Sequence, residues 1–203
     1  MNVLDAIEMR HSIRDYKPDD VPDEVLQKLL GAMRLAPSSG NRQPWKFVVV
    51  RERETREQIA SVCSYRRLSG ELQIQRFIAQ APVVIVACGS EAEANVFYKK
   101  GGLLSIAQGM ALRGDAVENM TDAQSTLLVD LASALSHLML AAIDEGLGTC
   151  WVMGVDEREV KRILRIPEWL RAPMVMTVGY PASAPHSKPR KPLEQIVCYD
   201  RYS

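Results

Sequence analysis

A long apolar stretch, residues 121–145, constrains the fold of this chain more than any other feature. Thr121 and Gln124 have the spacing of a capping box, in which each side chain satisfies a backbone N–H group at the start of a helix. Gly146 is the residue type that commonly follows a helix end. The residues between are almost all apolar or small. We therefore expect one long helix that is covered on nearly every face, in the centre of the fold or in a subunit interface.

Strand patterns and helix patterns alternate along the rest of the 203 residues. The unbroken apolar run 83–88 is typical of a strand covered on both faces. The predicted strands are 46–50, 83–88, 150–153 and 174–178, and the other predicted helices are 2–10, 23–35, 54–64, 66–80 and 156–164. We expect one domain over 1–203, in which residues 182–203 form an extended carboxy-terminal tail.

Charge balance and cysteine usage exclude several classes of protein. Lys and Arg number 25, as do Asp and Glu, which argues against a nucleic-acid binder that neutralises phosphates. No uninterrupted apolar run approaches the ~20 residues that cross a bilayer, and no signal peptide is visible. The four cysteines are scattered and the three histidines do not cluster near them. We expect a cytoplasmic protein with no metal site and with neither nucleic acid nor membrane as a partner.

A polar turn, residues 36–45, joins the predicted helix 23–35 to the strand 46–50. Its two prolines are Pro37 and Pro44, and Ser38, Ser39, Gly40 and Asn41 lie between them. Such a turn presents backbone N–H groups and short polar side chains at a sheet edge, where a planar polar ligand can bind. Ordinary turns have the same composition, so this segment alone decides nothing.

A basic segment follows the first predicted helix. Arg10, Ser12 and Arg14 place two guanidinium groups and a hydroxyl within five residues, and His11 lies among them. Charge-assisted, bidentate hydrogen bonds of this kind suit phosphate oxygens. The alternative is a solvated basic turn.

The segment Gly146-Leu147-Gly148 connects the long helix to the strand 150–153. Glycines let a backbone approach a ligand and turn its N–H groups outward. A simple helix-stop turn explains Gly146 but leaves Gly148 less well explained. The sequence has no G-x-G-x-x-G after a strand, no P-loop and no G-x-S-x-G, so Rossmann-type dinucleotide binding, P-loop chemistry and a hydrolase elbow lack support.

Taken together, these motifs resemble the nitroreductase family of FMN-dependent oxidoreductases. The matching segments are 10–14, 36–45, 81–84, 146–151 and 179–181 followed by Arg190. They occur in the family's order, and the resemblance covers nearly the whole chain. It implies an α+β fold with a central, mostly antiparallel sheet flanked by helices, in an intertwined homodimer with two FMN sites at the interface. The helix 121–145 is our candidate for the core of that dimer.

The resemblance also implies how the basic residues would hold the cofactor. Arg10 and Ser12 would bind the FMN phosphate, His11 would lie beside the phosphate and the ribityl chain, and Arg190 would close on the phosphate. Arg14 would lie near N1 and O2 of the isoalloxazine, where a fixed cation favours the reduced flavin.

Two further segments would contact the flavin ring. Pro37, Ser38, Ser39 and Asn41 would reach the flavin of the other subunit. The backbone N–H groups of Gly146, Leu147 and Gly148 would face flavin N5 and O4. Many members carry an Asn before the segment 81–82, and here Gln73 and Arg76 are open alternatives for its role.

The implied activity is a ping-pong reaction. NAD(P)H gives a hydride to flavin N5 and leaves, and an electron-poor small molecule such as a nitroaromatic or a quinone then accepts the electrons in the same pocket. No side chain need act as an acid or a base, so we name no catalytic residue. A same-fold flavoenzyme that performs dehalogenation, flavin breakdown or biosynthetic dehydrogenation is one alternative, a non-catalytic flavin-binding module is another, and a plain α/β domain with accidental motif matches is the last. Residues 89–120 align with no pattern, so the acceptor and the choice between NADH and NADPH stay open.

Overall fold

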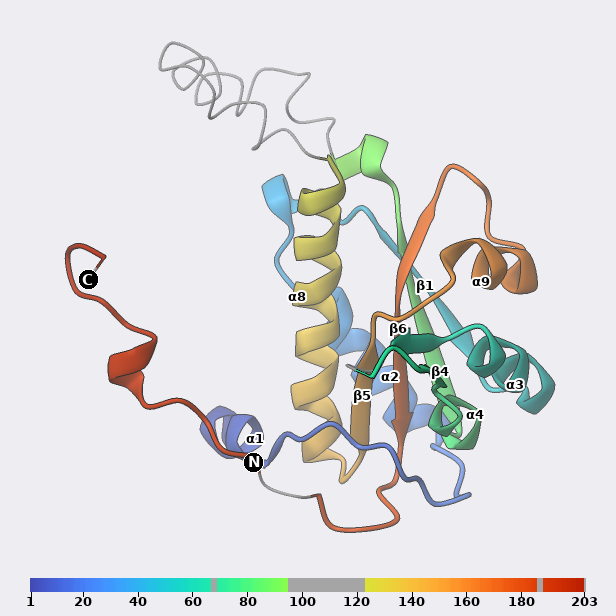
Figure 1. Ribbon diagram of the computed structural model, residues 1–203, viewed down its shortest axis with the longest axis horizontal. Coiled ribbons are helices and arrows are strands. Elements are labelled where there is room, and N and C mark those ends of the chain that lie inside the picture. Colours follow the sequence, from blue (N-terminus) through green and yellow to red (C-terminus); the bar gives the residue numbers. More distant parts are fainter. Residues whose placement is uncertain (67–68, 95–122, 186–187, 203) are drawn as a thin grey trace.

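The centre of the fold is a four-stranded antiparallel sheet with the order β1-β4-β6-β5. The computed structural model describes residues 1–66, 69–94, 123–185 and 188–202. The strands are β1 (Trp45–Val50), β4 (Val83–Gly89), β6 (Arg171–Gly179) and β5 (Gly148–Val152). Helices cover both faces of the sheet (Figure 1). The predicted fold class, a mostly antiparallel sheet flanked by helices, is confirmed.

Strand β4 separates two hydrophobic cores. All seven of its residues are buried, and successive side chains point to opposite faces of a strand. Val83, Ile85 and Ala87 therefore join the core under one helical layer, whereas Val84, Val86 and Cys88 join the other. The prediction that this strand is covered on both faces is confirmed.

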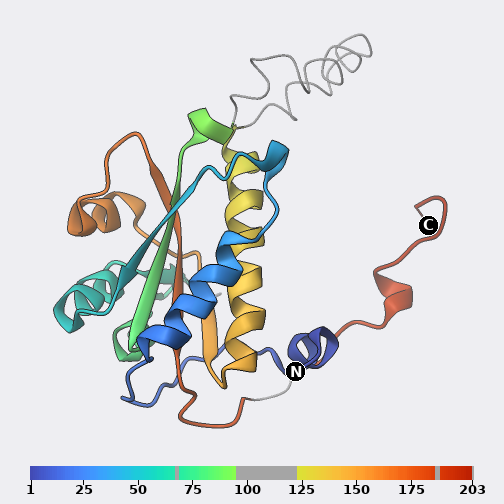
Figure 2. The same cartoon turned by 180° about the vertical axis from the view of Figure 1, so that it is seen from behind.

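One face of the sheet packs against α2 (Asp23–Arg34) and α8 (Ala123–Asp144), and the other packs against α3 (Arg53–Ser61) and α9 (Glu157–Leu164). Figure 2 shows α2 and α8 side by side across the sheet. Two predicted helix starts are also present. Asn2 accepts a hydrogen bond from Asp5 N at the start of α1 (Val3–Met9), and Asp156 accepts one from Glu159 N at the start of α9.

The predicted helix 66–80 is wrong. This region contains a hairpin of β2 (Ser64–Arg66) and β3 (Leu72–Ile74), followed by one helical turn, α4 (Phe77–Gln80). Gly70 has a φ of 85°, a conformation that a continuous helix cannot contain. Ser64 N donates to the carbonyl oxygen of Gly154 at 2.7 Å, so backbone contacts outside the segment hold the hairpin in place.

Helix α8 is present as predicted, but this chain alone does not cover it all round. Leu131, Leu135 and Leu138 are fully buried against the sheet, whereas Val129 is 65% exposed. By length and composition alone, Thr126–Asp144 could cross a membrane, with a mean hydropathy of 1.8. The core helix of a soluble protein passes the same test, so length and composition are weak evidence for a membrane span. Thr121 of the predicted capping box lies outside the described residues.

Gly146 ends α8 as predicted. Its φ is 70°, its N–H donates to the carbonyl oxygen of Ile143, and the N–H of Leu147 donates to that of Ala142. These two bonds form a Schellman motif, for which a residue in the left-handed region is needed.

The segment 182–202, as far as it is described, extends away from the sheet (Figure 1). Its only regular element in the described ranges 182–185 and 188–202 is the turn η2 (Leu193–Gln195). Apolar side chains of this tail are exposed, including Leu193 at 68% and Ile196 at 62%.

Candidate functional site

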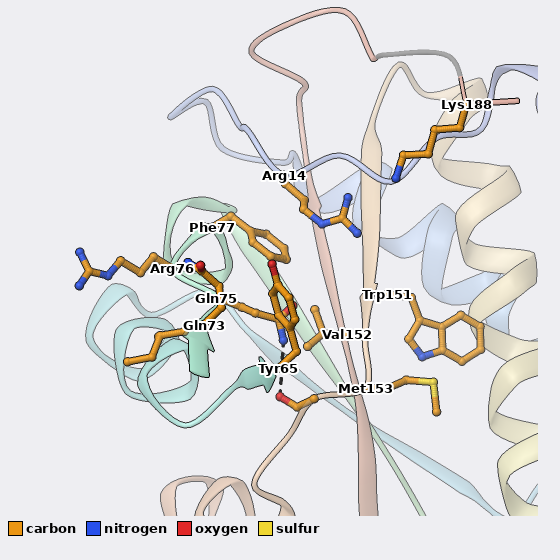
Figure 3. Close-up of a pocket in the computed structure, with 12 residues that line it drawn as sticks. Arg14, Tyr65, Gln73, Gln75, Arg76, Phe77, Trp151, Val152, Met153 and Lys188 are labelled. Atoms are coloured by element: carbon orange, nitrogen blue, oxygen red, sulfur yellow. Dashed lines mark hydrogen bonds between the residues drawn. The ribbon is translucent and has the colours of Figure 1, made fainter. Parts of the chain in front are cut away.

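A cavity of about 750 Å³ opens between the end of β5, the hairpin β2–β3 and the segment that follows α1. Its lining residues come from positions far apart in the sequence. They are Arg14, Tyr65, Gln73, Ile74, Gln75, Arg76, Phe77, Trp151, Val152, Met153, Gly154 and Lys188. Figure 3 shows Arg14 and Lys188 pointing toward the space between Phe77 and Trp151, whereas Arg76 points away from it.

Arg14 is held in place through the backbone of its neighbour Ile13. Ile13 N donates to the carbonyl oxygen of Thr149 at 2.9 Å, and Ile13 O accepts from the Tyr16 hydroxyl at 2.6 Å. Tyr16 also hydrogen-bonds Thr177 at 2.6 Å, and its burial raises the pKa of the phenol well above its ordinary value. The Arg14 guanidinium lies 5.8 Å from the centre of the Phe77 ring, within cation–π range. The sequence analysis predicts a cation at position 14, and the contacts of Ile13 and Phe77 fix the direction in which its guanidinium points.

Gly154 forms the opposite wall because its backbone comes very close to the hairpin. A Cβ atom at this position would clash with the carbonyl oxygen of Ser64. Gln75 Nε2 donates to Gly154 O at 3.5 Å, as the dashed line in Figure 3 marks. The sequence analysis missed Gly154, its neighbour Met153 and the aromatic wall of Tyr65 and Phe77. A glycine between the strand at 150–153 and the cap at Asp156 was the available signal.

The lining of the cavity suits a flat ligand that carries negative charge. Arg14 and Lys188 supply positive charge, Phe77 and Trp151 supply aromatic surface, and no described lining residue carries a carboxylate. The indole Nε1 of Trp151 is buried and has no hydrogen-bond partner among the described residues. A flavin has a planar ring with several acceptors, a pyrimidine edge that becomes negative on reduction, and in FMN a phosphate. The residues present fit such a group.

A smaller cavity of about 260 Å³ shares Arg14 and Lys188 with the first and adds Ser12 and the carboxylate of Asp15. The predicted residues Arg14 and Ser12 therefore lie together. Arg10 and His11 are half-buried next to them, and His11 Nδ1 lies 2.9 Å from Met9 O. Arg190 is exposed and lines neither cavity. Its assignment to the phosphate stays a prediction.

The segment 146–148 lines neither cavity. Gly146 ends α8, and Gly148 makes room for Ile13, whose side chain a Cβ at position 148 would clash with. Leu147 is buried in the core. The fold thus explains both glycines without a ligand, including Gly148, for which the sequence offered no clear structural reason. The prediction that these N–H groups face the flavin gains no support from this geometry, and Met153 and Gly154 occupy the cavity wall instead.

The turn 37–41 lies beside the first turns of α8, as Figures 1 and 2 both show. Ser38 and Ser39 are half-buried and Asn41 is exposed. None of the three lines the cavity that contains Arg14. Within one chain the fold therefore does not bring the two predicted flavin-binding segments together.

The described residues offer no metal centre, and two of the buried thiols are not activated. No group of three His, Cys, Asp or Glu in this part of the chain could hold a metal ion. Burial raises the pKa of both the Cys63 and the Cys88 thiols to about 12, so both remain protonated near neutral pH.

Comparisons with known proteins are consistent with a flavin as the ligand of this cavity. Residues 7–180 match the model of the Nitroreductase family. A Methanothermobacter thermautotrophicus protein with the provisional name NADH dehydrogenase/NAD(P)H nitroreductase is 32% identical over 193 residues, 93% of this chain and 82% of the relative. An FMN reductase [NAD(P)H] of Bacillus subtilis is 27% identical over 98% of this chain and 74% of its own length.

Two further comparisons extend this result. The iodotyrosine deiodinase of Thermotoga neapolitana is 27% identical and aligns over 98% of both chains. The crystal structure of a nitroreductase family protein from Clostridium novyi NT superposes with a TM-score of 0.70 at 26% identity, over 93% of this chain and 89% of that one. The chain is an NAD(P)H-linked oxidoreductase, and it belongs to the nitroreductase family.

Proposed function

We propose that this chain is an FMN-dependent reductase that uses NAD(P)H to reduce nitroaromatic, quinone or similar electron-poor acceptors. The observation that carries the proposal is the cavity itself. Arg14 and Lys188 point into a space with aromatic walls, and none of its described lining residues is acidic. The B. subtilis relative named for FMN reduction supports FMN as the flavin.

The residues that would hold FMN form two groups. Arg14, packed on Phe77, would face the pyrimidine edge of the ring, while Arg10, His11 and Ser12 would bind the phosphate end together with Lys188. The backbone of Met153 and Gly154 would take the position beside the ring that the sequence analysis gave to residues 146–148.

FMN supplies, when bound, hydride chemistry at N5 that carries two electrons from NAD(P)H to the acceptor in ping-pong order. The chain positions the reactants and stabilises charge. Arg14 would stabilise negative charge at the pyrimidine edge, because a cation that is already in position needs little reorganisation. A quinone would become a hydroquinone with a proton from solvent, so no side chain is required as an acid.

We also propose a homodimer, because one chain separates the two flavin-binding segments. Ser39 contacts Asp130 near the start of α8, whereas Ile13 is bonded to Thr149 beyond its end. The helix between Asp130 and Asp144 is about 21 Å long at 1.5 Å per residue. Two copies would bring the turn 37–41 of one chain to the Arg14 cavity of the other.

Exposed apolar surface supports the same assembly. Helix α1 exposes Val3, Leu4 and Ile7 by more than half beside α8, which exposes Val129. The tail adds Ile196 and further exposed apolar side chains. Covering these surfaces in a dimer would remove apolar area from water. We propose that the protein is soluble, cytoplasmic and active on small molecules alone.

Reductive dehalogenation is the second candidate, because the deiodinase relative aligns over 98% of both chains. The two candidates differ in their products. Nitro or quinone reduction consumes NAD(P)H and releases no halide, whereas dehalogenation of an iodophenol releases one iodide for each two electrons.

The test begins with the visible spectrum of the purified protein reconstituted with FMN. Anaerobic NADH or NADPH should bleach the flavin absorbance, and a quinone or a nitroaromatic should restore it. Iodide release from iodotyrosine, measured in the same preparation, would favour the second candidate. A flavin that binds but resists NAD(P)H would indicate a non-catalytic flavin module. Failure to bind FMN at all would contradict the proposal.

A further inference from the structure

Asp130 is a carboxylate buried in an otherwise apolar part of α8. It is 3% exposed, and its helix neighbours Leu127, Leu131 and Leu135 are fully buried. Its Oδ1 accepts a hydrogen bond from Ser39 N at 2.9 Å. Its Oδ2 is buried and has no hydrogen-bond partner in the part of the chain that the structure describes. Burial raises the pKa of this carboxyl, and the Ser39 N–H and the nearby Arg42 charge oppose that change.

Such a group does not stabilise a fold well. A buried charge loses its hydration, and one hydrogen bond compensates only partly. An apolar side chain at this position would avoid the cost of burying a charge, but it would leave Ser39 N without this acceptor. Stability therefore does not account for an aspartate at this position. The contact of Asp130 with the backbone of the turn 37–41 offers another reason for it.

The turn adopts a backbone conformation that needs support. The φ values are 61° at Gly40, 53° at Asn41 and, just after the turn, 52° at Gln43. All three lie in the left-handed region that residues other than glycine rarely adopt. Asn41 N donates to Ser38 O within the turn, and Gln43 N, just after it, donates to Ser38 Oγ. Both distances are 2.9 Å. Asp130 adds the link from this turn to a rigid helix. Strained backbone persists where surrounding contacts hold it, and it occurs often at ligand-binding sites.

We propose that Asp130 is a positioning residue for flavin binding: it holds Ser39 N so that the turn 37–41 keeps the conformation in which Ser38, Ser39 and Asn41 reach the partner subunit's flavin. This inference rests on the proposed function. Asp130 is retained for the shape of the turn, at some expense of stability, and it touches neither flavin nor substrate.

Three variants test this role. Asp130→Ala removes the acceptor. Asp130→Asn keeps an amide oxygen that can accept from Ser39 N. Ser61→Ala is the matched control, because the Ser61 hydroxyl bonds a carbonyl of its own helix α3, that of Gln58, at 2.7 Å, on the face of the sheet opposite to α8. Each variant is compared with the wild type by amide hydrogen exchange at Ser39 in the FMN-free protein, by FMN affinity, by sedimentation and by urea unfolding.

In Asp130→Ala we expect Ser39 to exchange about 10-fold faster and FMN to bind about 10-fold more weakly, the scale of one hydrogen bond to a charged group. Its resistance to urea should change little, because the removal of a buried charge offsets the loss of one hydrogen bond. Asp130→Asn should recover most of the Ser39 protection and of the FMN affinity, and Ser61→Ala should match the wild type. A purely structural residue would not separate stability from affinity in this way.

The outcomes separate this inference from the proposed function. Wild-type binding of FMN together with unchanged binding by Asp130→Ala would overturn the role of Asp130 alone. A loss of affinity that follows a loss of stability, or a change of oligomeric state with Ser39 still protected, would overturn it as well. If the wild type bound no FMN, the proposed function would fail and this inference with it.

Discussion

At the scale of single residues, Gly146 and Gly148 have different physical reasons to be glycine. Gly148→Ala would push its Cβ into Ile13, so we expect it to lower the free energy of unfolding by about 1–3 kcal/mol and to weaken FMN binding by displacing Arg14. Gly146→Ala meets no atom within 4 Å but keeps a φ of 70°, so it should cost about 1–2 kcal/mol and leave FMN affinity unchanged.

The measurements are urea unfolding and FMN titration. Gly31→Ala in α2 is the control, since a Cβ there meets nothing within 4 Å and alanine favours a helix. Equal losses of FMN affinity at positions 146 and 148 would instead indicate that this backbone binds the flavin directly.

The phosphate-binding prediction also belongs to single residues. Arg10→Ala and Arg190→Ala should each weaken FMN binding by about 1.5–3 kcal/mol, the range for hydrogen bonds to charged groups. Arg53→Ala on α3 is the control, because Arg53 pairs with Glu57 on the surface, away from both cavities. Unchanged titrations for both variants would remove these two arginines from the site.

At the scale of elements, one arginine links strand β6, helix α9 and the segment that follows β4. Arg171 at the start of β6 donates to both carboxylate oxygens of Glu157 on α9, at 2.8 and 2.9 Å, and also to Glu91 after β4. Burial alone would raise the pKa of Glu157, but the hydrogen bonds from Arg171 and from Ala172 N hold it below its ordinary value of 4.5.

Because the pKa of Glu157 is lowered in the folded state, its ionised form stabilises the fold. This contribution is complete above about pH 4.5 and disappears as the pH falls through the pKa of the folded state. We therefore expect urea unfolding to show a loss of about 1–2 kcal/mol below pH 4.5 in the wild type. Glu157→Gln should start less stable at pH 7 and lose less on acidification. Parallel pH curves for the two proteins would contradict this account.

Local sequence signals predicted most helices and strands. They failed where the structure depends on contacts with backbone far away in the sequence. Strand β4 and the caps of α1 and α9 follow from hydrophobic patterning and short-range side chains. The hairpin β2–β3 does not, because its position depends on the contact between Ser64 and Gly154. For the same reason the sequence identified Arg14 but not the Gly154 side of the cavity, which only tertiary contact brings opposite to it.

At the scale of the whole molecule, dimer formation and FMN binding should be coupled. Val129 on α8 is 65% exposed, so Val129→Glu would place a charge in the proposed interface. We expect the wild type to sediment at about twice the mass of one chain and the variant to shift toward the monomer. FMN affinity should fall with it, because each flavin would lose the turn 37–41 that the partner supplies.

Gln58→Glu on α3 adds the same charge to an exposed position on the opposite face of the sheet and should leave both properties unchanged. The decisive comparison is FMN affinity against protein concentration. If two chains share each flavin, affinity for Val129→Glu should recover as the concentration rises and dimers form again. A monomeric variant that binds FMN as tightly as the wild type, at every concentration, would show that the Arg14 cavity is sufficient and that the turn 37–41 serves another purpose.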